Sequence, residues 1–272
     1  MKRSFLYSLL IISNSTIAQN IVNQTPEAND NLEHIEVKRL WQPYRGNVPL
    51  IETPQAVDRI NSDILENEGI SRFMEALDLS PSIIRQNNSG GMFDSFAIRG
   101  FSGDENNPTG YLVNGFNSRG YNGNRSIANI ETIEVMKGPG SALYGQGEPG
   151  GTINIITKKP QFDEQGYIQG TLGNFNKKQV EFDYTNGLND EVAYRLNSSY
   201  EDSDTHRDNV YLESFHLSPS ILWNISNATN ISYEMEVLDQ EKPLDRGIFI
   251  LDNNFNTADS DNFYGDIRDG AH

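Results

Sequence analysis

The chain has 272 residues and a formal net charge of −17 at pH 7. A chain this acidic lacks the basic patch that binds nucleic-acid phosphates, so a nucleic-acid partner is excluded. It contains no cysteine, which excludes disulfides, thiolate catalysis and cysteine-ligated zinc. No phosphate-binding loop, nucleophile elbow or metalloprotease motif occurs, so no enzyme is expected. The four histidines have neither i, i+4 partners nor carboxylate clusters, and no metal site is predicted: they are His34, His206, His216 and His272.

The N-terminal residues 1–18 have the pattern of a secretory signal peptide. Lys2 and Arg3 precede a short apolar run that ends at Ile12, and a cleavage site is expected after Ala18. The run is well short of the ~20 apolar residues that a helical membrane span needs. No later segment approaches that length, so any membrane part must consist of strands.

Residues 19–52 are polar and without clear periodicity, which predicts a flexible arm. The arm is shorter than the ~50 residues that a separate folded domain usually needs, so no built-in signalling domain is expected. It contains one short extended patch, formed by Glu33, His34, Ile35, Glu36 and Val37.

Residues 53–159 have a globular composition and predict a small mixed α/β domain. Ser62 is the expected cap of a helix over 63–67, which Gly69 stops. A second helix is expected from Ser71, with Pro81 beyond its end. The expected strands are 55–60, 83–85, 95–99, 110–113, 133–136 and 152–157, and an Asn-Gly turn follows the fourth.

The last two of these strands flank a linker rich in glycine and proline. Residues 145–150 of this linker match the dinucleotide-binding pattern G-x-G-x-x-G. That pattern binds pyrophosphate only where it opens a helix, whereas here it leads into a β-branched run. Nucleotide binding is therefore rejected in favour of a tight turn between two strands.

In order and spacing, the motifs Ile-Glu-Val, Lys-Gly-Pro, Leu-Tyr-Gly and Pro-Gly-Gly resemble the plug-domain signature of TonB-dependent outer-membrane receptors, in the ferric-siderophore branch. The chain departs from it at Lys137, where the family usually has Arg, and at Thr132, where a basic residue is common. Since Lys lacks the bidentate fork of Arg, a plug-to-wall ion pair at Lys137 is expected to be weak. The signature positions are Gly100, Gly138, Pro139, Tyr144, Gly145, Pro149, Gly150 and Gly151.

The resemblance implies a receptor and transporter for a ferric siderophore. Its partners would be the chelate, the TonB energy-transducing protein and outer-membrane lipid. The patch at 33–37 would be the TonB box, which pairs with TonB as an added strand. No cofactor is implied, because iron would enter only as the chelate. Two alternatives stay open: the same machinery with another cargo, such as cobalamin or an oligosaccharide, and an adhesin-like surface protein that no longer transports.

The resemblance also places two Asn- and Gly-rich loops, 102–109 and 117–127, at the plug apex, where the ligand enters. Cationic and aromatic side chains there suit an anionic chelate with an organic shell. The plainer interpretation is a solvated connecting loop. The candidate ligand-binding residues are Arg99, Phe101, Arg119, Gly120, Tyr121 and Arg125.

Residues 160–272 alternate apolar and polar residues in segments of roughly ten, which is the pattern of a transmembrane β-barrel. Val180, Phe182 and Tyr184, for example, alternate with polar neighbours. A soluble β-sandwich also alternates and is the competing interpretation. Short connections are expected at 186–190 and 226–230, and longer ones at 201–209 and after 239. The family's wall has about 22 strands, whereas about five are expected here, so the chain is expected to be a fragment that begins an antiparallel barrel.

Overall fold

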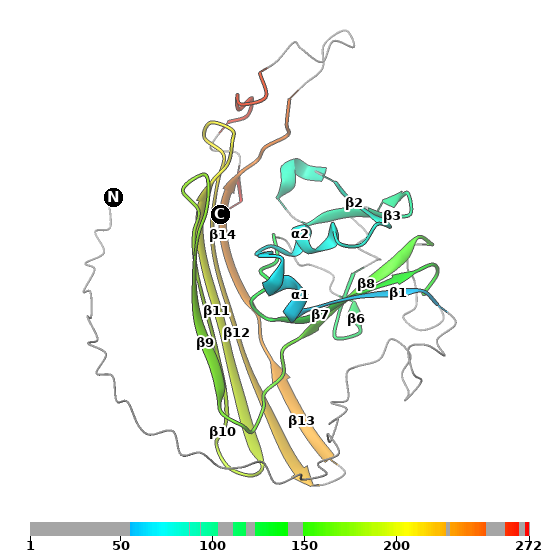
Figure 1. Cartoon of the computed structure of the whole chain (residues 1–272), viewed down its shortest axis with the longest axis vertical. Coiled ribbons are helices and arrows are strands. Elements are labelled where there is room, and N and C mark those ends of the chain that lie inside the picture. Colours follow the sequence, from blue (N-terminus) through cyan, green and yellow to red (C-terminus); the bar gives the residue numbers. More distant parts are fainter. Residues whose placement is uncertain are drawn as a thin grey trace, which may run out of the picture. The chain divides into compact units, whose positions relative to one another are not determined.

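A computed structural model describes residues 55–86, 88–92, 94–102, 111–117, 123–140, 149–226, 229–248, 259–266 and 270–271. Contacts divide the chain into two units, Met1–Leu40 and Trp41–His272, and all described residues belong to the second. The expected signal peptide and the TonB box therefore lie outside the described residues. The second unit contains three sheets, of five, three and seven strands (Figure 1).

The five-stranded sheet forms the centre of the plug. Its order is β1-β7-β8-β5-β6, and only the pairing of β5 with β8 is parallel. The alternating runs on either side of the Gly/Pro linker form the central pair, as the sequence predicts, with Ile133 opposite Ile155. The strands are β1 (Val57–Asn61), β5 (Tyr111–Val113), β6 (Phe116–Asn117), β7 (Ile130–Lys137) and β8 (Gly151–Thr157).

Two short helices, α1 (Ser62–Asn67) and α2 (Phe73–Leu77), pack on one face of this sheet. The cap of α1 is Asn61 and not Ser62, since the Asn61 side chain accepts the Ile64 N–H at 3.1 Å. Gly69, at φ +65°, follows its end as expected. No helix among the described residues is long and apolar enough to cross a membrane. The shared core contains Leu65, Phe73, Leu77, Ile133, Val135, Ile153 and Ile155.

The second, three-stranded sheet completes the plug. It has the order β2-β3-β4 and is antiparallel. A 3₁₀ turn, Asn88–Gly91, precedes β3. The strands are β2 (Ile83–Gln86), β3 (Ser95–Ile98) and β4 (Phe101–Ser102). The bounds of β2 and β3 are close to the predicted strands at 83–85 and 95–99.

The second face of the central sheet is buried as well, which the alternating pattern did not predict. Glu134 and Asn154 are both fully buried. They are satisfied by one another and by neighbours: Arg59 Nε donates to Glu134 at 3.0 Å, and Asn154 Nδ2 donates to the same carboxylate at 3.2 Å. The Gly115 N–H then donates to Asn154 Oδ1 at 2.9 Å. Burial raises the pKa of Glu134 above its ordinary value, although these bonds oppose the shift.

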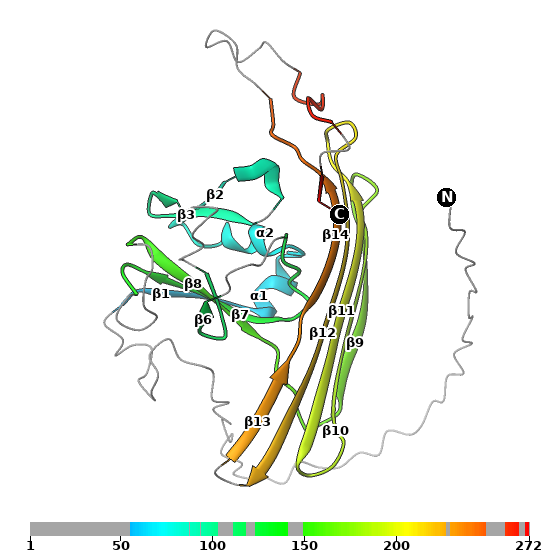
Figure 2. The same ribbon diagram turned by 180° about the vertical axis from the view of Figure 1, so that it is seen from behind.

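The seven-stranded sheet, called the wall below, is antiparallel throughout (Figures 1 and 2). β9 was not expected, because Gly166 and Gly170 interrupt its pattern. β13 and β14 both pair with β12 in the same register. The pairing is interrupted between them, opposite Pro219, because proline has no N–H to donate. The strands are β9 (Gln165–Leu172), β10 (Lys178–Gly187), β11 (Val192–Asp204), β12 (Tyr211–Ser226), β13 (Thr229–Glu234), β14 (Val237–Pro243) and β15 (Gly270–Ala271).

Burial in the wall follows the polar residues and not the apolar ones. Along β10, Gln179, Glu181 and Asp183 are buried, whereas Val180 is 53% exposed. The buried polar series faces the plug and the apolar series faces outward. A soluble sandwich would bury the apolar series, so that interpretation is wrong, and the alternation of a barrel wall is confirmed.

Candidate functional site

The tight turn between β3 and β4 presents two of the candidate ligand-binding residues. Arg99 and Gly100 both have positive φ, 53° and 86°, and this lets Ile98 pair with Phe101. Arg99 is exposed and Phe101 is 48% exposed. The turn therefore offers a cation and an aromatic face together. Arg119, Gly120 and Tyr121 lie outside the described residues.

Two signature glycines are required by close backbone contacts. A Cβ at Gly150 would lie 2.1 Å from the carbonyl oxygen of Ile98, and one at Gly151 would lie 2.5 Å from that of Met136. The strand β8 thus begins where the second plug sheet is pressed against the first. Gly138, at φ +97°, donates its N–H to the Gly150 carbonyl at 2.9 Å. Tyr144 and Gly145 lie outside the described residues, and Pro139 and Pro149 are exposed.

The expected plug-to-wall ion pair at Lys137 is wrong. Lys137 Nζ lies 2.7 Å from Asp58 Oδ2, so the pair joins β7 to β1 inside the plug. Burial tends to raise the pKa of Asp58, but bonds from Lys137 and Ser80 outweigh it and hold that pKa below its ordinary value. Lys137 therefore fastens the first plug strand and does not reach the wall.

Arg125 joins the plug to the wall. Its side chain is only 2% exposed, and Nη1 lies 2.7 Å from Glu236 Oε1, beside β14. The ring of His216, on β12, contacts the same oxygen through Nε2 at 2.9 Å. The Arg125 N–H also donates to Asp94, which burial gives a raised pKa. This buried, paired position differs from the exposed one expected at the plug apex.

A second contact forms at the start of α2. Arg72 pairs with Glu201 of β11, and its Nε donates to the carboxylate at 3.2 Å. Arg72 Nη2 also donates to Ser203 at 3.0 Å. Lys177, just before β10, bonds the hydroxyl of Ser71 and lies 3.8 Å from Glu201. The Glu201 carboxylate of the wall thus binds Arg72, the residue that precedes α2.

The third contact is a buried cluster where the plug continues into the wall. Arg195 donates twice to Asp183, at 2.8 and 2.7 Å, and Lys158 Nζ donates to the same carboxylate at 3.0 Å. Lys158 also donates to the Tyr167 hydroxyl at 3.0 Å. The Arg195 guanidinium reaches the Lys159 carbonyl at 3.0 Å. Both wall residues are buried, and the two bonds of the guanidinium to one carboxylate fix the position of the carboxylate that Lys158 contacts.

Glu234 of β13 gathers the fourth group of plug donors. Thr157 Oγ1 and Asn114 Nδ2 donate to Glu234 Oε2 at 2.8 and 3.0 Å, and Lys159 pairs with the other oxygen. In all four plug-to-wall ion pairs within the described residues, the plug supplies the cation and the wall the anion. The alternation of polar and apolar residues along each strand identifies these wall carboxylates as inward-facing. Nothing in the sequence, however, pairs them with particular plug cations.

The plug-to-wall interface is therefore polar, and it leaves some groups unsatisfied. Among the described residues, Gln179 Oε1, Asn197 Oδ1 and His216 Nδ1 are buried without a hydrogen-bond partner. Water can replace contacts of this kind, unlike those of an apolar core. Within the described residues, no group of three His, Asp or Glu side chains suits a metal ion.

Residues 49–152 match the family model described as TonB-dependent Receptor Plug Domain. The chain is 31% identical over 254 residues to the metal-pseudopaline receptor CntO of Pseudomonas aeruginosa, a match that covers 92% of this chain and 35% of that protein. It is 33% identical over 191 residues to the ferrioxamine B receptor of Salmonella typhimurium, covering 67% of this chain and 27% of that protein. The chain thus spans about a third of the length of these relatives.

Solved structures agree with the fold. The ferric-catecholate import receptor Fiu of Escherichia coli, in its open form, superposes with a TM-score of 0.65 at 26% identity, covering 74% of this chain and 29% of that one. A pyoverdine complex of Pseudomonas aeruginosa FpvA superposes with a TM-score of 0.72 at 20% identity, covering 80% and 30%. The chain therefore belongs to the TonB-dependent receptors of the Gram-negative outer membrane, with a plug domain followed by antiparallel strands that match the start of the family's barrel.

Proposed function

We propose that the receptor carrying this chain imports a ferric siderophore or a closely related metal chelate across the outer membrane. The observation that carries the proposal is the plug itself, folded against the polar face of the wall and held there by four ion pairs. Relatives of about the same similarity are named for ferrioxamine B and for metal–pseudopaline, which supports a metal chelate as the cargo.

In this proposal the chelate binds at the outer side of the plug. Arg99 and Phe101 offer charge and an aromatic face, and Arg119, Gly120 and Tyr121 are proposed to add to them. Arg125 instead acts through Glu236 as a tie between plug and wall.

Energy reaches the plug through the arm. The patch at 33–37 is proposed to pair with a TonB strand through its backbone, so that tension on the arm acts on β1, the first plug strand. Two ion pairs, Asp58–Lys137 and Arg59–Glu134, hold β1 on β7. They are the first contacts on which a pull on the arm would act. No bond of the cargo is made or broken, so the receptor is a transporter and not an enzyme.

A second cargo is favoured by one observation. The similarity to the metal-pseudopaline receptor extends over 92% of this chain, whereas the similarity to the ferrioxamine B receptor covers 67%. Metal–pseudopaline is therefore tested beside ferrioxamine B.

The test measures uptake by Gram-negative cells that lack their own siderophore receptors and produce this one. Radiolabelled ferrioxamine B and metal–pseudopaline are each supplied, with and without an uncoupler. Energy-dependent accumulation of either supports the proposal, and accumulation of neither overturns it. Ile35→Pro, which removes an N–H needed for strand pairing, is expected to abolish uptake and leave binding intact, whereas Ile35→Val is expected to transport normally.

A further inference from the structure

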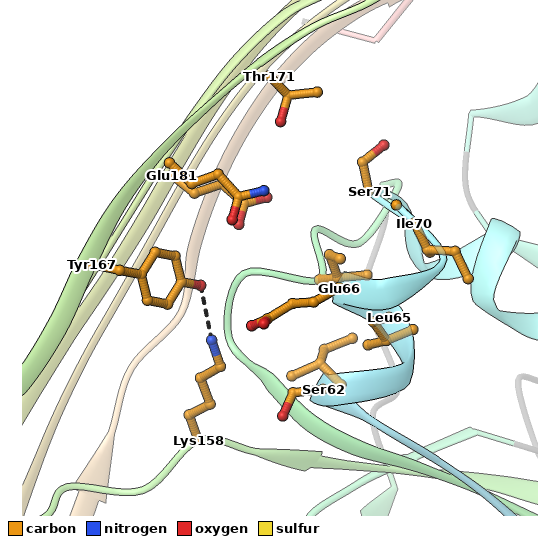
Figure 3. A pocket seen from close by; sticks show the side chains of 13 residues that line it. Ser62, Leu65, Glu66, Ile70, Ser71, Lys158, Tyr167, Thr171 and Glu181 are labelled. Carbon is orange, nitrogen blue, oxygen red and sulfur yellow. Dashed lines mark hydrogen bonds between the residues drawn. The ribbon is translucent and has the colours of Figure 1, made fainter.

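A cavity of about 210 Å³ lies between α1 and the wall strands β9 and β10 (Figure 3). Its volume is enough for on the order of seven water molecules. The plug contributes Ser62, Glu66 and Ser71 to the lining, and the wall contributes Tyr167, Thr171 and Glu181. The lining thus offers hydroxyl and carboxylate groups from both domains and a phenol from the wall. The plug also contributes apolar side chains, which are Leu65, Ile70, Ile127 and Ile130.

The plug is bonded to the wall around this cavity, and Lys158 bonds Tyr167 at one end of it, but in the part of the chain that the structure describes the helix α1 is not bonded to the wall. Ser126 and Ser199 lie with their hydroxyl oxygens 2.9 Å apart, and Asn129 Nδ2 donates to Ser218 at 2.6 Å. By contrast, no hydrogen bond or ion pair of the described residues joins α1 to the wall. The plug surface is therefore bonded along β11 and β12. It reaches β9 and β10 through Lys158, which bonds Tyr167 and Asp183, whereas α1 itself makes no such bond to the described wall strands.

The cavity has one fixed end and one looser end. Lys158, at the fixed end, belongs to the buried cluster with Asp183 and Arg195, and its side chain is 7% exposed. Breaking one partner of such a cluster leaves an uncompensated buried charge, which is strongly unfavourable. At the other end, Arg72 holds Glu201 with a side chain that is 35% exposed, so water can replace this pair at lower cost.

The helix α1 itself is lightly held. It has six residues, and Leu65 is its single buried side chain. Its other side chains are exposed or half-buried among the residues of this chain. A shift of α1 therefore breaks few contacts compared with a shift of the central sheet, whose strands β7 and β8 are buried on both faces.

We propose that the passage for the cargo opens at this cavity, by movement of α1 away from β9 and β10 while the Lys158 cluster stays in place. The inference rests on the proposed transport function and adds where the route lies. The wall side of the route is polar, which suits a cargo rich in hydrogen-bonding groups, and the plug side adds apolar contacts.

The test fills the cavity from the wall side. Thr171 lines the cavity, and its neighbour Leu172, 84% exposed, points to the opposite face of the same strand. Thr171→Trp is expected to reduce the uptake rate of ferrioxamine B or metal–pseudopaline by roughly tenfold or more, because an indole ring occupies the opening. Chelate binding to chilled cells is expected to be unchanged, and Leu172→Trp is expected to transport at the parental rate.

A second variant guards against misfolding by Trp. The chain has no cysteine, so Thr171→Cys adds one labelling site to it, in a receptor that folds before it is modified. Any cysteine elsewhere in the receptor is replaced first. Unlabelled Thr171→Cys is expected to transport, and attachment of a bulky polar maleimide is expected to stop it. Label on Leu172→Cys is expected to have no effect.

The outcomes separate the two proposals. A parental receptor that accumulates neither chelate overturns the proposed function, and this inference falls with it. A parental receptor that transports, together with labelled Thr171→Cys that transports equally well, overturns the inference alone.

Discussion

Burial decides how much each arginine of the plug contributes. The side chain of Arg125 is 2% exposed and bonded to Glu236, whereas Arg85 pairs with Asp78 at the same 2.7 Å but is 48% exposed. In water an exposed pair gains little, because solvent screens both charges. In the buried pair, loss of one partner leaves the other charge without compensation.

Arg125→Ala is therefore expected to destabilise the plug by about 3–5 kcal/mol. The matched change Arg85→Ala should cost less than about 1 kcal/mol. Denaturant titration of the purified receptor, followed by protease cleavage within the plug, measures both. Replacing Arg125 and Glu236 together by Met should recover part of the loss, since neither charge of the pair remains, although the buried His216 ring loses its bond to Glu236. Equal effects of the two single changes would contradict the assignment of Arg125 as a tie.

At the scale of elements, local sequence signals predict the plug well where backbone chemistry decides. The Asn114-Gly115 turn forms with φ of 51° and 78°, as that dipeptide indicates. The central strands appear where β-branched residues alternate. The cap of α1 is Asn61, one residue before the predicted Ser62. Asn and Ser are nearly equivalent caps, so the sequence alone does not decide between the two neighbouring positions.

What the sequence does not reveal depends on partners far along the chain. Glu134 and Asn154 are typical of a solvent-facing strand side, yet they are buried because Arg59 and the Gly115 N–H satisfy them across strands. The inward carboxylates of the wall follow the same rule. The sequence pattern shows which face of the strand they occupy, but their plug partners lie as many as 129 residues away, as for Arg72 and Glu201.

The junction of the two plug sheets gives a prediction at this scale. A Cβ at Gly150 would lie 2.1 Å from a backbone oxygen, whereas at Gly170, on β9, nothing lies within 4 Å. Gly150→Ala is therefore expected to cost about 1–3 kcal/mol of plug stability by overpacking, and Gly170→Ala is expected to be neutral. Thermal unfolding of the two variants side by side checks this. A neutral Gly150→Ala would mean that β8 can move away from β3 without cost.

At the scale of the whole molecule, the chain combines an apolar outer face with a polar interior interface. A soluble protein has the opposite distribution, with apolar side chains inside and polar ones outside. For this reason the composition alone, with a net charge of −17, indicates little about the fold. The plug has its own apolar core, so it can keep its fold while its contacts to the wall change. The proposed transport then requires either departure of the whole plug or a local opening.

A reversible cross-link distinguishes these two modes. Ser126 of the plug and Ser199 of β11 face each other with their hydroxyl oxygens 2.9 Å apart, and cysteines there are close enough for a disulfide. Ser126→Cys/Ser199→Cys is expected to form it, since this chain has no other cysteine and any elsewhere in the receptor is replaced first. If the passage opens at α1, the oxidised receptor should transport at a rate close to that of its reduced form and of either single variant. Loss of uptake on oxidation, restored by reduction, would instead show that the plug must separate from β11, and the opening would then involve the whole domain.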